Sequence, residues 1–310
     1  MVRALYRLAV IAVGFVTVLG LLTPIDPLPE LINQFRPQLL LMAVLVAAFG
    51  FLLPTRTWHC TALAIAAVNV ALFAVPLFMT AGRASSAPAG ESVTLVTFNL
   101  GYSREHAAIQ AFLQEQDPAV LVLQELKTHH AEELLPALKQ MFPHQVICEL
   151  CGMAVLTKTP LTSVSESPSG RWVSGLWSSP GGRVQRIVGV HFSWPVYALG
   201  QKEDEVELSS VVQAWPEPKI VAGDFNLTPW TWKLNKITWT TGLRRHGTFA
   251  ASWPVYRRVA EKHDFARLPI PSVVLIDNVL TSPGISNESF MTGPDLGSDH
   301  RAVVVRLRLP

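Results

Sequence analysis

The chain has 310 residues, of which 49% are hydrophobic and only 15% are charged, a composition too apolar for an ordinary soluble protein. The length allows one good-sized domain plus an additional segment. From Ser92 onward, Lys plus Arg and Asp plus Glu each number 20, so this part is formally neutral. It lacks the basic charge that is typical of domains that grip long nucleic acid.

Three apolar stretches without a formal charge open the chain, over residues 8–22, 38–53 and 58–81. A membrane-spanning helix needs about 20 apolar residues, with a lower limit of roughly 17. The third stretch meets this length, whereas the first two need help from flanking residues. Because Arg3 and Arg7 precede the first stretch, a cleaved signal peptide is its alternative interpretation, but two more stretches follow at once. We therefore predict a membrane anchor over residues 1–81 with three transmembrane helices.

Positively charged residues predict how the anchor is oriented, because cytoplasmic loops carry an excess of Lys and Arg. Arg3 and Arg7 precede the first predicted helix, and Arg56 lies in the turn between the second and the third. This pattern places the N-terminus in the cytosol and everything after the third helix outside it, although Arg83 argues weakly for the reverse. We expect an integral protein of the plasma or inner membrane whose remaining chain is periplasmic or extracellular.

Residues 82–91 are small and polar, which predicts a flexible linker that holds the following domain close to the bilayer. Beyond it, residues 92–310 alternate between β-rich apolar runs and amphipathic segments. Strands are expected over residues 93–98, 119–123, 153–156, 171–177, 184–192, 219–222, 273–280 and 301–309; helices are expected after Ser103, over 129–142 with a break at Pro136, and over 203–213. The alternation predicts a layered α/β domain.

Two of the three cysteines, Cys148 and Cys151, form a C-x-x-C that lacks a second metal-binding pair and the sequence context of a redox helix. Outside the cytosol they would form a local disulfide, and two unpaired structural thiols are the alternative. Cys60 lies in the third apolar stretch, where it is expected to act as a small apolar residue.

Two further groups of side chains have both a structural and a functional interpretation. The first is a basic cluster, which is either a solvated face or a phosphate-binding patch: Arg244, Arg245, His246, Arg257, Arg258, Lys262 and His263. The second is a set of aromatic residues that either pack in the interior or form an apolar rim for a base, a sugar or a lipid: Trp194, Trp230 and Trp232.

Polar residues at the ends of apolar runs are the most informative feature of the chain. In order, they lie in Thr97-Phe98-Asn99, Gln124-Glu125, His191, Gly223-Asp224-Phe225-Asn226, Ile276-Asp277 and Ser298-Asp299-His300. A layered sheet fold can gather such strand ends into one site, and few structural needs demand this arrangement of acidic, amide and imidazole groups. The ordered set resembles the endonuclease/exonuclease/phosphatase superfamily over about residues 92–310. The resemblance implies phosphoester hydrolysis and a four-layer α/β sandwich, in which helices flank two packed mixed sheets.

The resemblance also implies a divalent cation, Mg²⁺ or Mn²⁺, with Glu125 as its principal ligand and Asn99 and Asp299 as assisting ligands. Two departures from relatives bear on this site. Abasic-site endonucleases carry Asp two residues after the first Asn, where this chain has Gly101, which weakens a DNA-repair role and puts more weight on Glu125. Many relatives carry His or Tyr after the late Asp, where this chain has Asn278.

The same resemblance assigns the catalytic roles. Asp224 orients or deprotonates the attacking water, and Asn226 donates its amide to the phosphate. His300 faces the phosphate, while Asp277, on a strand expected beside it, accepts the other N–H of the ring. His191 helps to bind the phosphate or protonates the leaving oxygen.

Functions of different classes stay open at this point. The first is a membrane-anchored phosphodiesterase or phosphatase that acts outside the cytosol on a phospholipid head group, a nucleotide or a nucleic acid. The neutral domain and short linker favour a small or membrane-borne phosphoester over long duplex DNA. The second is a catalytically silent binding or scaffold protein, which would be free to lose motifs that are intact here. A part of a transporter or channel has little support, because the apolar stretches contain no charges. The sequence identifies no protein partner.

Overall fold

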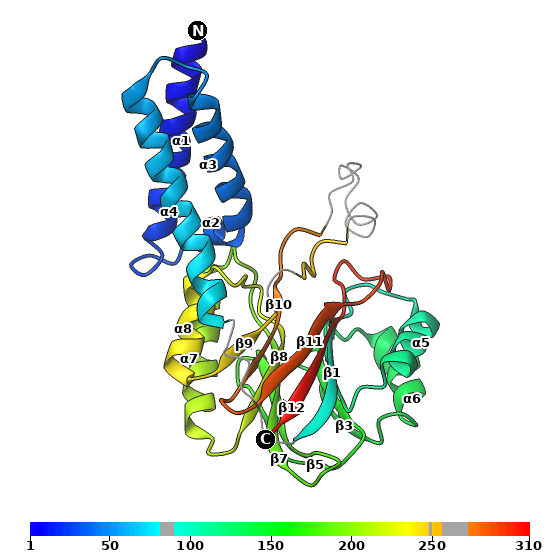
Figure 1. Ribbon diagram of the computed structural model, residues 1–310. Coiled ribbons are helices and arrows are strands. Elements are labelled where there is room, and N and C mark those ends of the chain that lie inside the picture. Colours follow the sequence, from blue (N-terminus) through cyan, green and yellow to red (C-terminus); the bar gives the residue numbers. More distant parts are fainter. Residues whose placement is uncertain (81–89, 248–249, 256–271) are drawn as a thin grey trace.

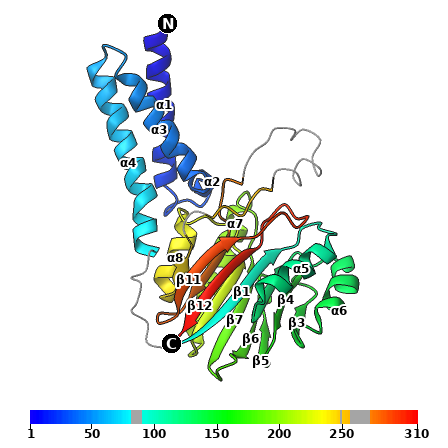
Figure 2. The ribbon, with the colours of Figure 1, turned by 45° about the vertical axis from the view of Figure 1, so that its right-hand side comes forward.

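The computed structural model describes residues 1–80, 90–247, 250–255 and 272–310. A helical bundle made by the first 80 residues projects from an α/β domain (Figure 1). Its helices are α1 (Val2–Leu21), α2 (Glu30–Gln34), α3 (Arg36–Gly50) and α4 (Arg56–Thr80). The N-terminus lies at the end of the bundle far from the domain, whereas α2 lies at the end near it (Figure 2).

The bundle matches the prediction of three transmembrane helices only in part. α1 and residues Arg56–Phe78 of α4 are long and apolar enough to cross a membrane, with mean hydropathies of 2.1 and 2.2. α3 has 15 residues, which at 1.5 Å each gives about 22 Å, less than the hydrocarbon core of about 30 Å. The helix is short because the backbone leaves helical geometry at Phe35 (φ −107°, ψ 30°), so the preceding residues form the separate helix α2.

Two six-stranded mixed sheets form the centre of the domain. The first has the order β11-β12-β1-β2-β4-β3 and the second the order β5-β6-β7-β8-β10-β9. Strands of the first are β1 (Glu91–Asn99), β2 (Val120–Gln124), β3 (His144–Cys148), β4 (Met153–Thr157), β11 (Ser286–Thr292) and β12 (Val303–Leu309). Strands of the second are β5 (Leu161–Glu166), β6 (Trp172–Ser178), β7 (Val184–His191), β8 (Lys219–Asp224), β9 (Arg244–His246) and β10 (Asp277–Thr281). The only parallel pairs among these described strands are β1–β2 and β7–β8.

Helices cover the outer face of each sheet (Figure 2). α5 (His106–Gln116), the π-helical η1 (His130–Leu134) and α6 (Leu135–Leu138) pack on the first sheet, and α7 (Ala198–Ala214) and α8 (Trp232–Thr241) pack on the second. Between the sheets lies a third apolar layer, to which Val122 and Ile187 contribute. This arrangement confirms the predicted sandwich of two mixed sheets flanked by helices.

In the described part of the α/β domain, the sequence pattern missed four strands and one helix. The strands are β3, β5, β9 and β11, which are the four edge strands of the two sheets; the helix is α8. Pro136 lies in the first turn of α6, directly after the π-helical turn, so the expected break falls before it. Most of the predicted linker, residues 82–91, lies outside the described residues, and β1 already includes Glu91.

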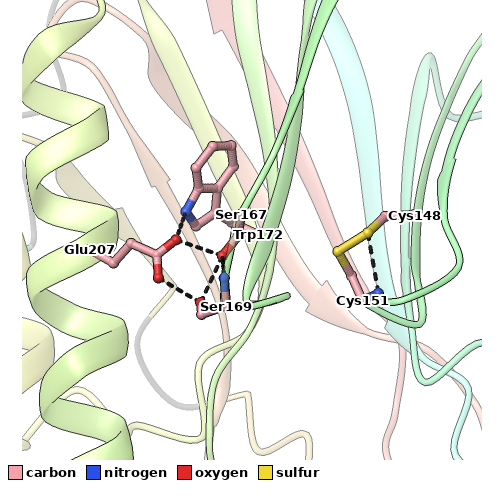
Figure 3. The surroundings of a disulfide bond; sticks show 6 residues. All are labelled: Cys148, Cys151, Ser167, Ser169, Trp172 and Glu207. Carbon is pink, nitrogen blue, oxygen red and sulfur yellow. Dashed lines mark hydrogen bonds between the residues drawn. A yellow bond between two sulfur atoms is a disulfide. The ribbon is translucent and has the colours of Figure 1, made fainter.

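A disulfide joins Cys148 and Cys151 across the turn from β3 to β4 (Figure 3), and Cys60 is exposed on α4. Nearby, Glu207 of α7 accepts hydrogen bonds from three donors of the β5–β6 region, Ser167 Oγ, Ser169 Oγ and Trp172 Nε1, at 2.6, 2.5 and 2.9 Å (Figure 3). These bonds tie the helix layer to an edge of the second sheet.

Gly223 of β8 should be intolerant of any side chain. Its φ is +150°, and a Cβ atom there would lie 2.1 Å from the carbonyl oxygen of Val190 on the adjacent strand. Because that oxygen belongs to the backbone, Gly223→Ala should lower the free energy of unfolding by at least about 2 kcal/mol, as measured by thermal unfolding in detergent. Gly182→Ala is the control, since Gly182 also has a positive φ but an added Cβ meets nothing within 4 Å. Equal losses for the two variants would contradict the steric argument.

Candidate active site

Strand register brings polar side chains together at one end of each sheet. Asp224 closes β8, and its partners on the two neighbouring strands are His191 of β7 and Asp277 of β10. In the first sheet, Asn99 ends β1 beside the end of β2, and Glu125 follows β2 directly. Because the two sheets pack face to face, these strand ends meet in one place.

Asn99 links the two sets. Its Nδ2 donates to Glu125 Oε1 at 3.3 Å and to Asp224 Oδ2 at 3.0 Å, while its Oδ1 accepts the N–H of Gly101 at 3.0 Å. Lys127 Nζ lies 3.2 Å from Glu125 Oε2. Since Gly101 holds the Asn99 oxygen, this side chain presents a donor to both carboxylates. The orientation favours a positioning role over the ligand role expected for Asn99.

The turn after β8 fixes Asp224 and Asn226 relative to each other. The N–H of Asn226 donates to Asp224 Oδ1 at 2.8 Å, and Asn226 has a φ of +50°, a left-handed conformation that Asn adopts more readily than most residues. Its Nδ2 donates to the carbonyl oxygen of Phe192 at 2.9 Å. The second hydrogen of this amide has only a long contact, 3.5 Å from Nδ2 to Asp224 Oδ2, so it is the one that the expected donation to a phosphate would use.

His300 lies where the two sheets meet. Its Nδ1 is 2.9 Å from Asp277 Oδ2, the contact that the sequence predicts, and its Nε2 is 3.8 Å from Asp224 Oδ2. The expectation that Asp277 lies on a strand beside the final one is wrong, because β10 belongs to the second sheet and β12 to the first. The pair instead connects the sheets face to face. Ser298 Oγ orders the turn by accepting the His300 N–H and donating to the Asn99 carbonyl.

The buried cluster holds both signs of charge. Burial lowers the pKa of His300, but the charges of Asp277 and Asp224 outweigh this effect and raise that pKa to about 10. Burial, reinforced by the charge of Asp277, raises the pKa of Asp224 to about 7. At neutral pH the cluster therefore contains an imidazolium and a carboxyl group close to its midpoint of ionisation.

The other two ionisable groups differ from this pair. His191 Nε2 lies 3.9 Å from Asp224 Oδ2, and burial lowers the pKa of His191 to about 4 despite the opposing charge of Glu125. Burial raises the pKa of Glu125, but the charges of His191 and Lys127 and the hydrogen bonds that it accepts bring this pKa below its ordinary value. At neutral pH, His191 is neutral and Glu125 is ionised.

Of these ionisable groups, Glu125 and His300 line a pocket of about 170 Å³, whose polar lining also includes Asn226 and Asp299. A Cβ atom on Gly101 would lie 2.7 Å from Asp299 Oδ1. Any larger residue at position 101 would have to displace this carboxylate. Glycine at that position thus makes room for Asp299 at the pocket.

Carboxylates on the pocket fit a hard divalent cation. Glu125 and Asp299 supply oxygen donors, which Mg²⁺ prefers, and Mg²⁺ needs only one or two carboxylates because it keeps several waters. The ammonium group of Lys127 against Glu125 shows that positive charge is accommodated there. A separate set, Asp224, Asp277 and His300, has ligand atoms within 4.8 Å of one another and so could share an ion, but the Asp277–His300 bond already uses two of the potential ligand atoms.

Another cluster that could hold a metal consists of His106, His129 and His130, none of which lines the pocket. Its rings are engaged by protein groups: His106 Nδ1 contacts Glu133 Oε2, and both other rings contact the carbonyl oxygen of Ser103. These bonds explain the cluster as a structural link between α5 and the following helical turn.

The aromatic residues divide between the two interpretations. Trp194 is 53% exposed and lines the pocket, as a rim residue would. Trp230 is buried and stacks on Phe73 of α4, with ring centroids 5.3 Å apart, and Trp232 packs edge-on against Trp239 of the same helix. The last two are packing residues.

The basic cluster does not form one exposed patch. Arg245 is 2% exposed, so it cannot be part of a solvated basic face, and burial lowers its pKa to about 10. Burial likewise lowers the pKa of His246 to about 4. Arg244 is exposed, and the remaining members, Arg257, Arg258, Lys262 and His263, lie outside the described residues.

Two residues at the site were not anticipated from the sequence. Lys127 pairs with Glu125, and Gln34 of α2 hydrogen bonds to the backbone of Asn226. A lysine two residues after the key glutamate is a signal that could have been noticed. Nothing in the sequence around Gln34 connects it with a loop some 190 positions later.

The fold and this arrangement define a class of protein: an α/β sandwich with acidic, amide and imidazole groups gathered at its strand ends. The sequence profile of the Endonuclease/Exonuclease/phosphatase family matches residues 96–300. The protein belongs to this family, whose members are generally phosphoesterases and nucleases. A comparison with curated protein sequences finds no significant match.

Solved structures share the fold at low sequence identity. A family protein from Bacteroides thetaiotaomicron has 16% identity and a TM-score of 0.55, covering 71% of this chain and 99% of its own. One from Beutenbergia cavernae has 19% identity and a TM-score of 0.53, covering 70% and 72%. A mutant beta toxin from Staphylococcus aureus with bound magnesium ions has 12% identity and a TM-score of 0.52, covering 71% and 100%.

Asp224→Asn should stabilise the protein more at high pH than at low pH. The folded pKa of Asp224, about 7, lies above its ordinary 3.8, so its stabilising contribution is full below about pH 4 and is lost as the pH rises through 7. Asn does not titrate. The Tm of the variant minus that of the unmodified protein, both measured with chelator, should therefore rise between about pH 4 and pH 8.

The test is how this Tm difference changes with pH. The new amide at position 224 also alters the hydrogen bonds there, but that effect shifts the Tm difference by the same amount at every pH. Asp26→Asn, at an exposed position, controls for the loss of one carboxylate. A Tm difference that stays constant over this range would show that Asp224 does not take up a proton on folding.

Proposed function

We propose that this protein is a membrane-anchored, divalent-metal-dependent phosphoester hydrolase, either a phosphodiesterase or a phosphatase, whose catalytic domain lies outside the cytosol. The observation that carries the proposal is that ionised Glu125 and the imidazolium of His300 line one pocket, while the buried Asp224, whose pKa is about 7, lies behind them, 3.8 Å from His300 Nε2. Family membership supports the reaction class, and a structural neighbour with bound magnesium ions supports the cofactor.

Each group has a task in such a reaction. A divalent cation held by Glu125 and Asp299 would withdraw charge from a phosphate oxygen. Asp224, with a pKa near 7, accepts a proton from the attacking water. His300, kept protonated by Asp277, donates a hydrogen bond to the phosphate and stabilises the negative charge that develops there.

His191 faces the same Asp224 carboxylate from the neighbouring strand. Because it is neutral at pH 7, it serves better as a hydrogen-bond donor to the phosphate than as the acid that protonates the leaving group. The family resemblance implies two roles for His191, and of these His191 binds the phosphate and does not protonate the leaving oxygen.

A catalytically silent scaffold is the alternative, and the buried cluster argues against it. Burying Asp224 beside Asp277 destabilises the fold at neutral pH, as the raised pKa of Asp224 shows. A scaffold protein without catalytic activity would gain nothing from this loss of folding stability. Carboxyl groups with perturbed pKa values are, by contrast, characteristic of catalytic sites.

The helical bundle supports membrane anchoring. Only 28% of the apolar window of α1 and 17% of that of α4 are buried, whereas a core helix of a soluble protein would be mostly buried. α1 and α4 begin at the end far from the domain, so Arg3, Arg7 and Arg56 lie opposite to it (Figure 1). With the disulfide, this favours a domain outside the cytosol.

Glu125→Gln should abolish most metal-dependent activity. The change removes the ionised carboxylate while keeping the side-chain size, and a site with few protein ligands should lose metal affinity strongly. With bis-p-nitrophenyl phosphate and p-nitrophenyl phosphate as substrates, activity at limiting Mg²⁺ should fall at least about a hundredfold and recover partly at high Mg²⁺.

Lys127→Gln is the matched control, because it removes the partner of Glu125 but no oxygen donor. It should leave the Mg²⁺ requirement in place. Full activity of Glu125→Gln at limiting Mg²⁺ would show that the cation is held elsewhere, and activity of the unmodified protein in chelator would remove metal dependence from the proposal.

Cysteine labelling tests the orientation. In a Cys60→Ala background, a Lys202→Cys variant carries a thiol on the exposed side of α7, and Thr57→Cys carries one at the opposite end of the bundle. A membrane-impermeant maleimide should label Lys202→Cys in intact cells and Thr57→Cys only after lysis. The reverse pattern would place the catalytic domain in the cytosol.

A further inference from the structure

The anchor contributes one wall of the active-site pocket. Leu31, Gln34 and Phe35, from α2 and the break that follows it, line the same pocket as Glu125 and His300. The bundle is therefore more than a tether, since the pocket is complete only when residues from the two ends of the chain come together.

Hydrogen bonds hold this wall against the β8–α8 loop, residues 225–231. Gln34 is 3% exposed. Its Nε2 donates to the Asn226 carbonyl at 2.8 Å, and its Oε1 accepts the N–H of Thr228 at 2.9 Å. One side chain of the anchor thus satisfies two backbone groups of the loop that carries Asn226.

Further contacts on both sides of Gln34 extend the joint. Glu30 Oε1 accepts the N–H of Lys233 at 2.8 Å, and Gln38 Nε2 donates to the Val273 carbonyl at 3.3 Å. Trp230 donates from Nε1 to the Phe73 carbonyl at 3.0 Å. Because these bonds come from α2, α3 and α4, the whole base of the bundle fixes the wall.

The wall is apolar where it is exposed. Leu31 and Phe35 are 43% and 42% exposed, and they line the pocket together with Trp194 and Val196, which are 53% and 61% exposed. None of the described residues lining this pocket is Lys or Arg. An apolar slot beside the phosphate-directed groups suits an alkyl chain, whereas a nucleic acid strand would need cations for its neighbouring phosphates.

We propose that α2 is a specificity element of this enzyme: Leu31 and Phe35 bind the apolar group next to the phosphate of a membrane lipid, while Gln34 positions the β8–α8 loop. The inference rests on the proposed phosphoester hydrolysis. If α1 and α4 cross the bilayer, the base of the bundle lies at its surface, and a lipid in that leaflet reaches the pocket without leaving the membrane. Ile25 and Leu28, exposed at 85% and 70% in the preceding loop, suit the same interface.

A matched pair of phosphodiesters tests the wall: methyl p-nitrophenyl phosphate and hexyl p-nitrophenyl phosphate, which share the phosphate and the leaving group. With the full-length protein in detergent, kcat/KM should favour the hexyl ester at least about tenfold, since its five additional methylene groups can be buried against the wall. The double variant Leu31→Ser/Phe35→Ser should lose most of this preference, and the single variant Leu31→Asn should lose part of it.

Leu28→Ser is the control, because Leu28 is exposed on the same segment but does not line the pocket; it should keep the preference. Absence of a preference in the unmodified protein, or its retention in the folded double variant, would overturn the lipid assignment. Failure of the unmodified protein to cleave either diester or p-nitrophenyl phosphate with Mg²⁺ or Mn²⁺ would instead remove the proposed hydrolysis itself.

The positioning role of Gln34 has its own readout. Gln34→Ala should lower kcat about tenfold for both esters without changing the ratio between them, because the β8–α8 loop serves the chemistry common to both. Gln34→Glu keeps the acceptor for the Thr228 N–H and should restore part of kcat. Unchanged kcat in a folded Gln34→Ala variant would limit α2 to its apolar contacts.

Discussion

The arrangement of this site depends on one constraint: two carboxyl groups and an imidazole are buried together where the two sheets meet. Asp277 and Asp224 repel each other, and the shared imidazolium of His300, together with the hydrogen bonds that Asp224 accepts from Asn226 and Asn99, makes their burial tolerable. That cation comes from the first sheet, while both acids come from the second. The electrostatic balance therefore requires the sheets to pack in one relative position, and the same packing brings Asn99 and Glu125 to the cluster.

Most of the domain could be predicted from its sequence, and the parts that could not share a physical cause. The predicted strands are central ones, such as β2 and β4, whose residues are buried on both faces and so appear as continuous apolar runs. The four missed strands are edges. β5 and β11 are largely exposed and polar, so burial gives them no apolar pattern. α8 was missed because its buried set includes Lys233 and only two aliphatic residues, too few for a periodic stripe.

The site shows a similar division. Residues at the ends of central strands, such as Glu125 and Asp224, were predictable because strand termini converge and their chemistry is specific. Their orientations were not: that Asn99 presents its amide nitrogen depends on the N–H of Gly101, a backbone detail. The hydrogen bonds of Gln34 to the β8–α8 loop could not be predicted at all, because they depend on how the bundle docks onto the domain. Hydrophobicity patterns describe each part alone and carry no information about that joint.

A buried polar network inside the bundle holds this joint in place. Arg36 donates to Asn69 Oδ1 at 3.3 Å and to Asn33 Oδ1, and Asn69 donates to Thr17 Oγ1 at 2.9 Å, all buried at the base of the bundle. Gly20 makes room, since a Cβ there would lie 2.6 Å from an Arg36 nitrogen. Polar groups cost free energy when buried, and helices that only anchor need none. α2, with five residues, is too short to be stable alone. The hydrogen-bond network beneath α2 is directional, so it fixes the position of α2 more closely than apolar packing alone would. The position of α2 in turn determines the shape of the pocket.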